Sequence, residues 1–337
     1  MDRVTLKTIA DRAGVTVSCV SQALRDLPGV GAATKERIQR LARELGYRPD
    51  PALSALVAYR ARTQPAAFRS VLAWVGEHHE VNAPKSPRFV ASRGRAASLG
   101  YHMEFLPLAS PKHDWAKVLR IARARGIRGI FLAPRSRYDE EFPDVSLTDC
   151  CLTTVGYSVR LPGIHRVSTN QYLDMFRHVE ALREWGYRKI GLWVPPQADG
   201  RVNHQFSGGY LAAHFAAGDI PPEINTRENL RKAELSAWIR SQELDCVIGL
   251  SGHLAPLRDA GFRIPDDLGF STFDWHGGEE VRDVSGMDYC PDRLLEGAVD
   301  VLHSLLLNNR TGLSEAYPLT LYHGRMVEGR TTRRCPV

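Results

Sequence analysis

Apolar residues near the start of the chain recur at the spacing of an amphipathic helix, in two short blocks joined by a turn that contains glycine. The first block, residues 6–13, follows Thr5, which can cap free backbone amides, and precedes Gly14, which suits the left-handed end of a helix. The second block begins after Thr16 and carries small polar residues in its first turn. Two such helices indicate a helix-turn-helix, although any helical hairpin gives the same pattern.

Two more helices are predicted before residue 63. Residues 34–45 place their apolar side chains on one face and end at Gly46, so we expect this helix to complete a three-helix core. Residues 49–63 begin with Pro-Asp-Pro, which is typical of a helix start, and then repeat Leu53, Leu56 and Val57 at helical spacing. A helix this short is marginal alone in water, so it should form only when something holds it.

Beyond residue 63 the pattern changes to short apolar runs separated by amphipathic helices. Such alternation predicts parallel sheets with right-handed crossovers, and the runs are numerous enough for two sheets. Ligands of open parallel sheets lie beyond the carboxyl ends of the strands. The predicted strands are 71–76, 127–133, 189–194, 246–250 and 268–273, and the candidate ligand segments after them are 77–80, 134–138, Tyr157, 195–203, 251–253 and 274–276.

Charge is divided unevenly along the chain. The net charge is +6, and residues 1–62 hold 11 Lys or Arg against 6 Asp or Glu, whereas the other 275 residues hold 33 against 32. A basic segment suits a phosphate backbone, because each neutralised phosphate releases condensed counterions. A solvated basic surface would carry the same charge, so charge alone does not decide between them.

Length and composition exclude several classes of protein. The 337 residues, 43% hydrophobic and 24% charged, have room for two or three globular domains. The sequence contains no apolar run of bilayer length and no apolar signal-peptide core at the N-terminus, so we expect no membrane contact and a cytoplasmic protein. The six cysteines lack metal-site spacing, and the sequence contains no P-loop, G-x-S-x-G or H-E-x-x-H motif. We therefore expect no enzyme, no metal and no cofactor.

The first sixty residues resemble, in order and spacing, the head and hinge of the lactose-repressor (LacI-type) family of bacterial transcriptional regulators. The segments that carry the resemblance are VTLKTIADRAGVTVSCVSQAL, PGV, T-x-E-R-I and ELGYRP. It implies a second helix in the major groove and two hinge helices that meet in the minor groove at the centre of a pseudo-palindromic operator. The positions that match base-reading residues are Val17, Ser18 and Gln22; those that match backbone contacts are Thr5, Thr16, Cys19, Ser21, Arg25 and Tyr47.

Three head and hinge positions either have an alternative role or depart from the family's usual residue. Leu56, with Leu53 beside it in the hinge, matches a leucine that wedges into the central base step; packing against its twin helix is the alternative. Cys19 stands where the family commonly has Thr, which weakens a phosphate hydrogen bond there. Gln22 replaces a frequent Arg, and because Gln pairs best with adenine and Arg with guanine, we expect a changed base preference.

The rest of the chain resembles, more loosely, the family's effector-binding core, which is shared with periplasmic sugar-binding proteins. The segments are EWGYRKIGLW, DAGFRIPDDLGFSTFD and GRMVEGRTTR. The implied domains are a head (1–48), a hinge (49–63) and a two-lobed core (64–337) that closes on a small molecule and supplies dimer contacts. We assign 64–156 plus 288–318 to lobe 1 and 157–287 plus 319–337 to lobe 2.

The candidate effector residues come from this resemblance and from the strand ends. Asp274 matches a carboxylate suited to sugar hydroxyls, with helix capping as the alternative, and Phe89 matches an aromatic that can stack on a ligand, with core packing as the alternative. Phe206 stands where the family often has arginine, and Leu250-Ser251-Gly252 replaces an S-N-D segment, so the effector can be less hydroxylated, differently charged or absent. The full candidate set is His78, Phe89, Tyr157, Asn203, Phe206, Asp274 and Trp275.

Three tryptophans fall at predicted strand ends and can form an aromatic cleft: Trp74, Trp193 and Trp275. Core packing is the alternative, and we favour it for Trp74 and Trp193.

The sequence thus predicts an α/β protein with an N-terminal three-helix helix-turn-helix head, a hinge helix and a two-lobed, periplasmic-binding-protein-like core of two parallel sheets flanked by helices. We expect a transcriptional regulator, a repressor by type, that binds double-stranded operator DNA as a homodimer and is modulated by a sugar-like small molecule. The alternatives are control of the core by a protein partner, and an orphan regulator without an effector. A solute receptor of the periplasmic type would lack the DNA-binding head.

Overall fold

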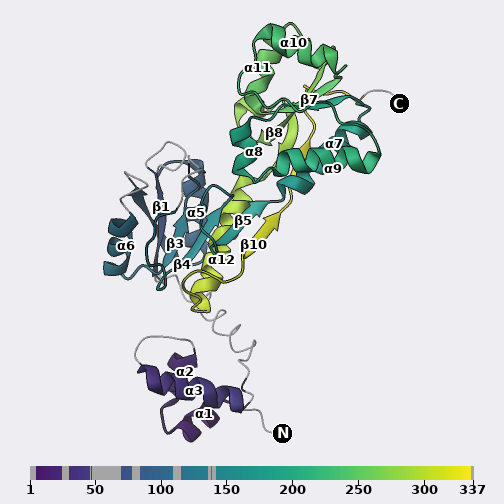
Figure 1. Cartoon of the computed structure of the whole chain (residues 1–337). Helices are drawn as coiled ribbons and strands as arrows, with labels where there is room; N and C mark the ends of the chain where they lie inside the picture. Colours follow the sequence, from purple (N-terminus) through teal and green to yellow (C-terminus); the bar gives the residue numbers. More distant parts are fainter. Residues whose placement is uncertain are drawn as a thin grey trace.

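The computed structural model of the chain describes residues 5–24, 30–45, 47, 70–77, 84–108, 115–135, 138 and 142–334 (Figure 1). The predicted hinge helix of residues 49–63 lies outside this set. Within it, no helix is long and apolar enough to cross a membrane.

Three helices form the head: α1 (Leu6–Ala13), α2 (Val17–Leu24) and α3 (Ala32–Glu44). Thr5 caps α1, since its Oγ1 accepts a hydrogen bond from the Thr8 amide (3.3 Å), and Gly14 ends the helix in the left-handed region at φ 65°. Ile9, Val20 and Ile38 are fully buried, one from each helix. The predicted helix-turn-helix and the core-completing role of the third helix are therefore confirmed.

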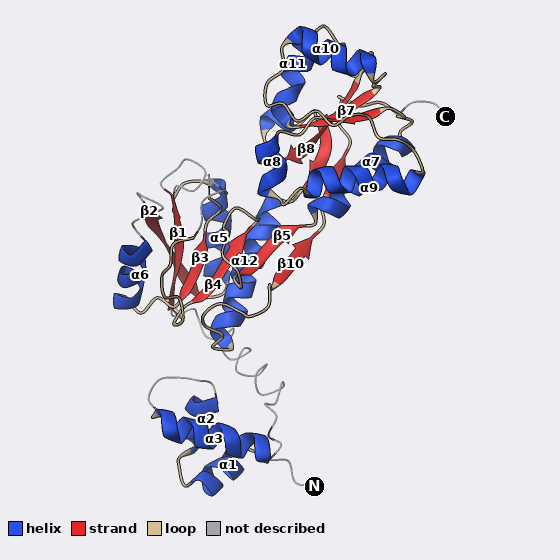
Figure 2. Cartoon of the chain, viewed as in Figure 1, coloured by secondary structure: helices blue, strands red, loops and turns tan. Residues whose placement is uncertain are grey.

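Six parallel strands form the first sheet, in the order β10-β5-β4-β3-β1-β2 (Figure 2). Helices α5 (Pro87–Ser98) and α12 (Pro291–Leu307) pack on one face, and α6 (Trp115–Ala124) packs on the other. Because both faces are covered, the inner strands consist largely of apolar residues. The strands are β1 (Ser70–Glu77), β2 (Tyr101–Leu108), β3 (Gly129–Leu132), β4 (Cys151–Val155), β5 (His165–Thr169) and β10 (Leu319–Tyr322).

Five strands form the second sheet, in the order β11-β9-β8-β7-β6, with β11 alone antiparallel to its neighbour. Helices α7 (Gln171–Glu184) and α9 (Gln205–Ala217) pack on one face, and α10 (Lys232–Ser241) and α11 (Leu254–Asp259) on the other. Helix α8 (Pro196–Arg201) follows β6. The strands are β6 (Ile190–Leu192), β7 (Cys246–Gly249), β8 (Gly269–Trp275), β9 (Ser285–Asp288) and β11 (Arg325–Val327).

The chain crosses between the two sheets three times: after β5, between β9 and α12, and between β10 and β11. Two of these crossings are tied together by a hydrogen bond from the Asn170 amide to the Tyr322 carbonyl (2.9 Å). Next to it, the Gly324 amide donates to the buried Asp174 carboxylate (Oδ2, 3.0 Å). Three parallel connections of this kind are what a hinge between two lobes requires.

The two-lobed, parallel-sheet architecture agrees with the prediction, but the lobe boundaries do not. Strands β5 and β10 fall in segments that we assigned to lobe 2, and both pair within the first sheet. The error has a physical cause: His165–Thr169 and Leu319–Tyr322 are short and half polar, and they pair at one edge of that sheet, so they lack the apolar run of a central strand.

Candidate nucleic-acid interface and ligand cavity

The second helix of the head presents part of the predicted reading set. Val17 begins α2 and is 44% exposed, while Val20 and Ala23 on the other face are fully buried in the head core. Gln22 and Cys19 are half-buried. The side chains of Ser18 and Ser21, and Arg25, Leu53 and Leu56 as a whole, lie outside the described residues, so their predicted roles stay predictions.

Two predicted backbone-contact residues serve as helix caps. Thr16 Oγ1 accepts a hydrogen bond from the Cys19 amide (3.2 Å) at the start of α2. Thr5 caps α1 in the same way, and Tyr47 packs against the head core. A capping hydroxyl uses its oxygen as acceptor and keeps its proton as a donor, so capping is compatible with a phosphate contact.

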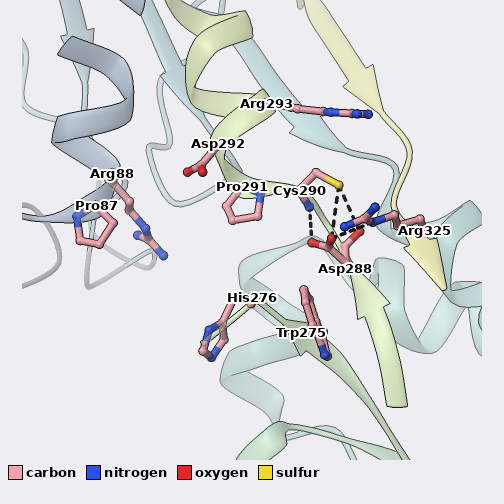
Figure 3. Close-up of a pocket in the computed structure, with 11 residues that line it drawn as sticks. Pro87, Arg88, Trp275, His276, Asp288, Cys290, Pro291, Asp292, Arg293 and Arg325 are labelled. Atoms are coloured by element: carbon pink, nitrogen blue, oxygen red, sulfur yellow. Dashed lines mark hydrogen bonds and ion pairs between the residues drawn. The ribbon is translucent and has the colours of Figure 1, made fainter. Parts of the chain in front are cut away.

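A cavity of about 840 Å³ lies where the two lobes face each other (Figure 3). The first lobe contributes the start of α5, with Pro87 and Arg88, and the start of α12. The second contributes the turn after β8, the end of β9 and the start of β11. This position, at the carboxyl ends of β8 and β9, is where open parallel sheets place ligands. The lining residues are Pro87, Arg88, Trp275, His276, Gly277, Asp288, Cys290, Pro291, Asp292, Arg293 and Arg325.

At one wall of the cavity, the carboxylate of Asp288 is held by hydrogen bonds and an ion pair with neighbouring residues of the same wall. This buried carboxylate accepts a hydrogen bond from the Cys290 amide (2.8 Å) and pairs with Arg325 Nε (3.0 Å). Burial and the Asp288 charge raise the pKa of the Cys290 thiol, which therefore stays protonated. Cys290 has left-handed backbone (φ 48°) immediately before Pro291 and α12, so the chain turns sharply at this wall.

The opposite wall carries Arg88, whose side chain extends from α5 toward Pro291 and His276 (Figure 3). Desolvation by the surrounding protein, followed by the positive charge of Arg201, lowers the pKa of this guanidinium. Within the described part of the chain, no group of three or more His, Cys, Asp or Glu is placed to hold a metal ion.

Of the predicted effector residues, Trp275 lines the cavity and Asp274, next to it, does not. The Asp274 carboxylate accepts hydrogen bonds from the Ser251 amide (2.7 Å) and hydroxyl (3.2 Å) and from Thr272 Oγ1. Ser251 begins the short 3₁₀ turn η1 (Ser251–His253), so Asp274 caps a helical start. Asp274 therefore has the helix-capping role that was the alternative to sugar binding.

Phe89 and Phe206 are corrected to core residues. Phe89 is 3% exposed and meets Trp74 edge to face, with ring centroids 5.7 Å apart. Phe206 is 6% exposed and packs against Phe273 (4.5 Å between centroids). An apolar side chain gains more from burial than from a position at a wet cavity wall, and α5 and α9 each turn it toward the sheet.

The remaining predicted residues also lie away from the cavity lining. Tyr157 is half-buried beneath the Arg166 guanidinium (5.5 Å to the ring centroid), and Asn203 is exposed in the turn between α8 and α9 with φ 55°. His78 lies outside the described residues. Trp74 and Trp193 are fully buried, as favoured, so the three tryptophans do not form one aromatic cleft.

The lining residues that the sequence did not predict belong to the start of α5, with Pro87 and Arg88, and to β9, the start of α12 and β11. Strand β9 has the sequence Ser-Gly-Met-Asp, which shows no apolar run. One signal was available: Pro291 followed by Asp292 marks a helix start, and such starts commonly lie at ligand sites.

A second contact between the lobes lies beside the cavity. Arg201 at the end of α8 donates from Nη1 to the Arg135 carbonyl (2.9 Å), beyond the end of β3. The Arg201 and Arg160 guanidinium carbons lie 5.7 Å and 5.3 Å from the centroid of the Tyr138 ring. The contacts of Arg201 join the lobes at a point away from the three crossings, and Arg160 holds the Tyr138 ring from within the first lobe.

Comparison with known proteins identifies the head. Residues 5–50 match the family described as "Bacterial regulatory proteins, lacI family". An HTH-type transcriptional regulator of Mycolicibacterium smegmatis is 25% identical over 191 residues, which span 56% of this chain and only 51% of that protein. The HTH-type transcriptional repressor CytR of Escherichia coli is 22% identical over 284 residues, 80% of each chain.

Two solved structures share the fold over 98% of this chain and 100% of their own. The lac repressor dimer bound to operator and the anti-inducer ONPF has a TM-score of 0.56 at 15% identity, and the transcriptional regulator CelR-cellobiose complex has 0.52 at 16%. The family match thus covers the head, and at these identities the solved structures show a shared fold. The match of residues 5–50 to the lacI-family model agrees with the resemblance given for the head.

Proposed function

We propose that this chain is a repressor that binds a two-fold symmetric operator as a homodimer, and that a small polar metabolite in the cavity between the lobes changes its affinity for DNA. The observation that carries the proposal is the combination in one chain of a lacI-family head and a cavity bounded by two lobes with three crossings. The boundaries 1–48, 49–63 and 64–337 are the proposed head, hinge and core.

A dimer is required by the size of the head. One recognition helix covers only a half-site, so a specific operator needs two heads and two-fold protein symmetry. The lac repressor of similar fold is a dimer on its operator, which supports this arrangement. Val17, Ser18 and Gln22 are the proposed base-reading residues, and Leu53 and Leu56 the proposed minor-groove residues.

The small-molecule part rests on the cavity and on the related fold. About 840 Å³ is room for a ligand of one or two sugar rings, and the CelR structure of the same fold holds cellobiose. Trp275 and His276 supply flat surfaces at one wall, as polar ligands with apolar faces require.

Selection of DNA from a random pool by the purified full-length protein tests the DNA part. We expect a two-fold symmetric consensus bound by two chains per site, with stoichiometry measured by analytical ultracentrifugation. A matched Gln22→Ala variant should lose preference at one symmetric base pair only. Recovery of no symmetric sequence contradicts the proposal.

Fluorescence anisotropy of the selected operator, titrated with a panel of sugars, tests the regulatory part. Linkage is reciprocal: if a sugar changes the protein's affinity for DNA by some factor, DNA changes the protein's affinity for that sugar by the same factor. The proposal is supported if one sugar changes the affinity for the operator and the operator changes the affinity for that sugar. Operator affinity that stays constant for every compound but changes when a cell extract free of small molecules is added supports control by a protein partner instead.

A further inference from the structure

Some charged side chains that line the cavity are paired with one another, and others have no such partner. Three arginines and two aspartates line it, and one of each, Arg325 and Asp288, form an ion pair at 3.0 Å. Of the remaining charges, Arg88 and Arg293 form no ion pair or side-chain hydrogen bond with any residue that the structure describes. The unpaired charge on the wall is therefore mainly positive.

The acceptors that would bind a neutral sugar are largely occupied. Asp274, the carboxylate expected to accept from sugar hydroxyls, already accepts from Ser251 and Thr272. Asp288 already accepts from Cys290 and Arg325. Asp292 alone keeps its carboxylate without a partner in the described part of the chain, and it lies in the first turn of α12, where the helix dipole favours a negative charge.

Among the residues that the structure describes, no carboxylate pairs with Arg88. It extends into the cavity from the first turn of α5, a helix of 12 residues whose first turn contains no acidic residue. Desolvation by the surrounding protein, and then the like charge of Arg201, lower the pKa of Arg88. A guanidinium held there gains strongly from an oxyanion, which it can bind through two parallel hydrogen bonds.

We propose that the ligand of this cavity is an anionic sugar derivative, whose carboxylate or phosphate group binds Arg88 and whose hydroxyl groups face Asp292. The proposal rests on the proposed function, since it names the chemical class of the same effector. It explains why the polar residues expected at a neutral sugar site, at positions 206 and 250–252, are replaced here while arginine is present on the cavity wall.

Isothermal titration of the full-length protein with matched sets of probes tests this assignment. Each set is a neutral hexose, its uronate and its 6-phosphate, for glucose, galactose and mannose, all at one ionic strength. We expect at least one anionic probe to bind at least about tenfold more tightly than its neutral parent, the range for a charge-assisted contact. The uronate and phosphate arms show which anion is bound.

Two variants on the same helix sharpen the test. Arg88→Gln should lower the affinity for the anionic probe by about tenfold or more and leave the affinity for its neutral parent unchanged. Arg93→Gln is the matched control: Arg93 also lies on α5, but its guanidinium lies over the Phe89 ring (5.7 Å) and outside the cavity lining, so binding should be unchanged. Thermal unfolding without ligand should confirm that both variants fold.

The outcomes separate the two proposals. A neutral hexose that binds as tightly as its charged forms, or an anion whose affinity is the same for Arg88→Gln, overturns the anionic assignment and leaves the proposed function standing. If no probe of any set binds, the small-molecule part of the proposed function fails and the anionic assignment fails with it.

Discussion

Two adjacent glycines in α9 allow the packing of the second lobe to be tested with an internal control. A Cβ atom at Gly209 would lie 2.2 Å from the carbonyl oxygen of Tyr172 and 3.0 Å from the Cβ of Met175, both on α7. A Cβ atom at Gly208 would lie 3.7 Å from the Tyr172 ring, an ordinary contact. Only the change at Gly209 therefore forces α7 and α9 apart.

The expected magnitudes follow from two opposing effects. Replacing glycine by alanine inside a helix raises the free energy of unfolding by about 1 kcal/mol through helix propensity. Overpacking against a backbone atom that cannot rotate away costs about 1–3 kcal/mol. The propensity gain is common to both variants and cancels in their difference, so Gly209→Ala should be about 1–3 kcal/mol less stable than Gly208→Ala.

Urea unfolding of the wild type and both variants, at one protein concentration, measures this difference. The free energies are compared through the transition midpoints, because the variants expose nearly the same surface and share one m-value. We expect Gly208→Ala at or above the wild-type midpoint and Gly209→Ala below it. Equal midpoints for the two variants would refute the claim that α9 needs glycine at position 209 to approach the α7 backbone.

Three further predictions concern the head and the pH dependence of stability. Thr16→Ala should remove the cap of α2 and cost about 1 kcal/mol of head stability, measured by amide hydrogen exchange in α2, whereas Thr16→Ser should retain it. Gln22→Arg should shift one symmetric base pair of the selected operator toward guanine, and an unchanged consensus would remove Gln22 from the reading set. Burial lowers the pKa of His178 from 6.5 to about 3, so the unfolded chain takes up the proton first and stability falls as pH drops below 6.5, by about 1.4 kcal/mol per pH unit. A His178→Gln variant should show a shallower fall between pH 7 and pH 5, and parallel curves would contradict the assignment.

The sequence predicted the parts of this structure in which one local pattern decides the outcome. The head helices follow from short amphipathic blocks with Thr5, Gly14 and Thr16 at their ends, and the central strands follow from apolar runs that must be buried on both faces. Strand β9 was missed because three of its four residues are small or polar. The Ser285 hydroxyl, for example, shares a hydrogen bond with the Thr332 hydroxyl (2.6 Å), and this bond joins distant segments. Such pairing depends on the fold and leaves no local pattern.

The same reason explains why the ligand site was only partly predicted. Trp275 follows a strand that the pattern shows, so its place at the cavity was predictable, whereas Arg325 and Asp288 come together only through the antiparallel pairing of β11 with β9. Phe89 was expected at the site because the resemblance matches it to a ligand-stacking aromatic, and Phe206 because it stands where the family often has arginine. An aromatic residue at either position fits burial in the adjacent core as well as it fits a ligand contact, so the sequence does not separate the two roles.

The location of the cavity residues bears directly on how the proposed effector would act on DNA. Cys290 and Asp288 lie at the second crossing, and Arg325 follows the third, so a ligand at this wall contacts chain segments whose backbone must turn when the lobes move. Arg88 reaches the same ligand from the first lobe, and its contact depends on the angle between the lobes. A ligand shifts a conformational equilibrium only by its difference in affinity for the two states, and a site built from both lobes and from their connections provides such a difference. An anion that binds Arg88 in the first lobe and also contacts Trp275 or His276 in the second would therefore favour one lobe angle, whereas a ligand that touches one lobe alone would bind without changing it.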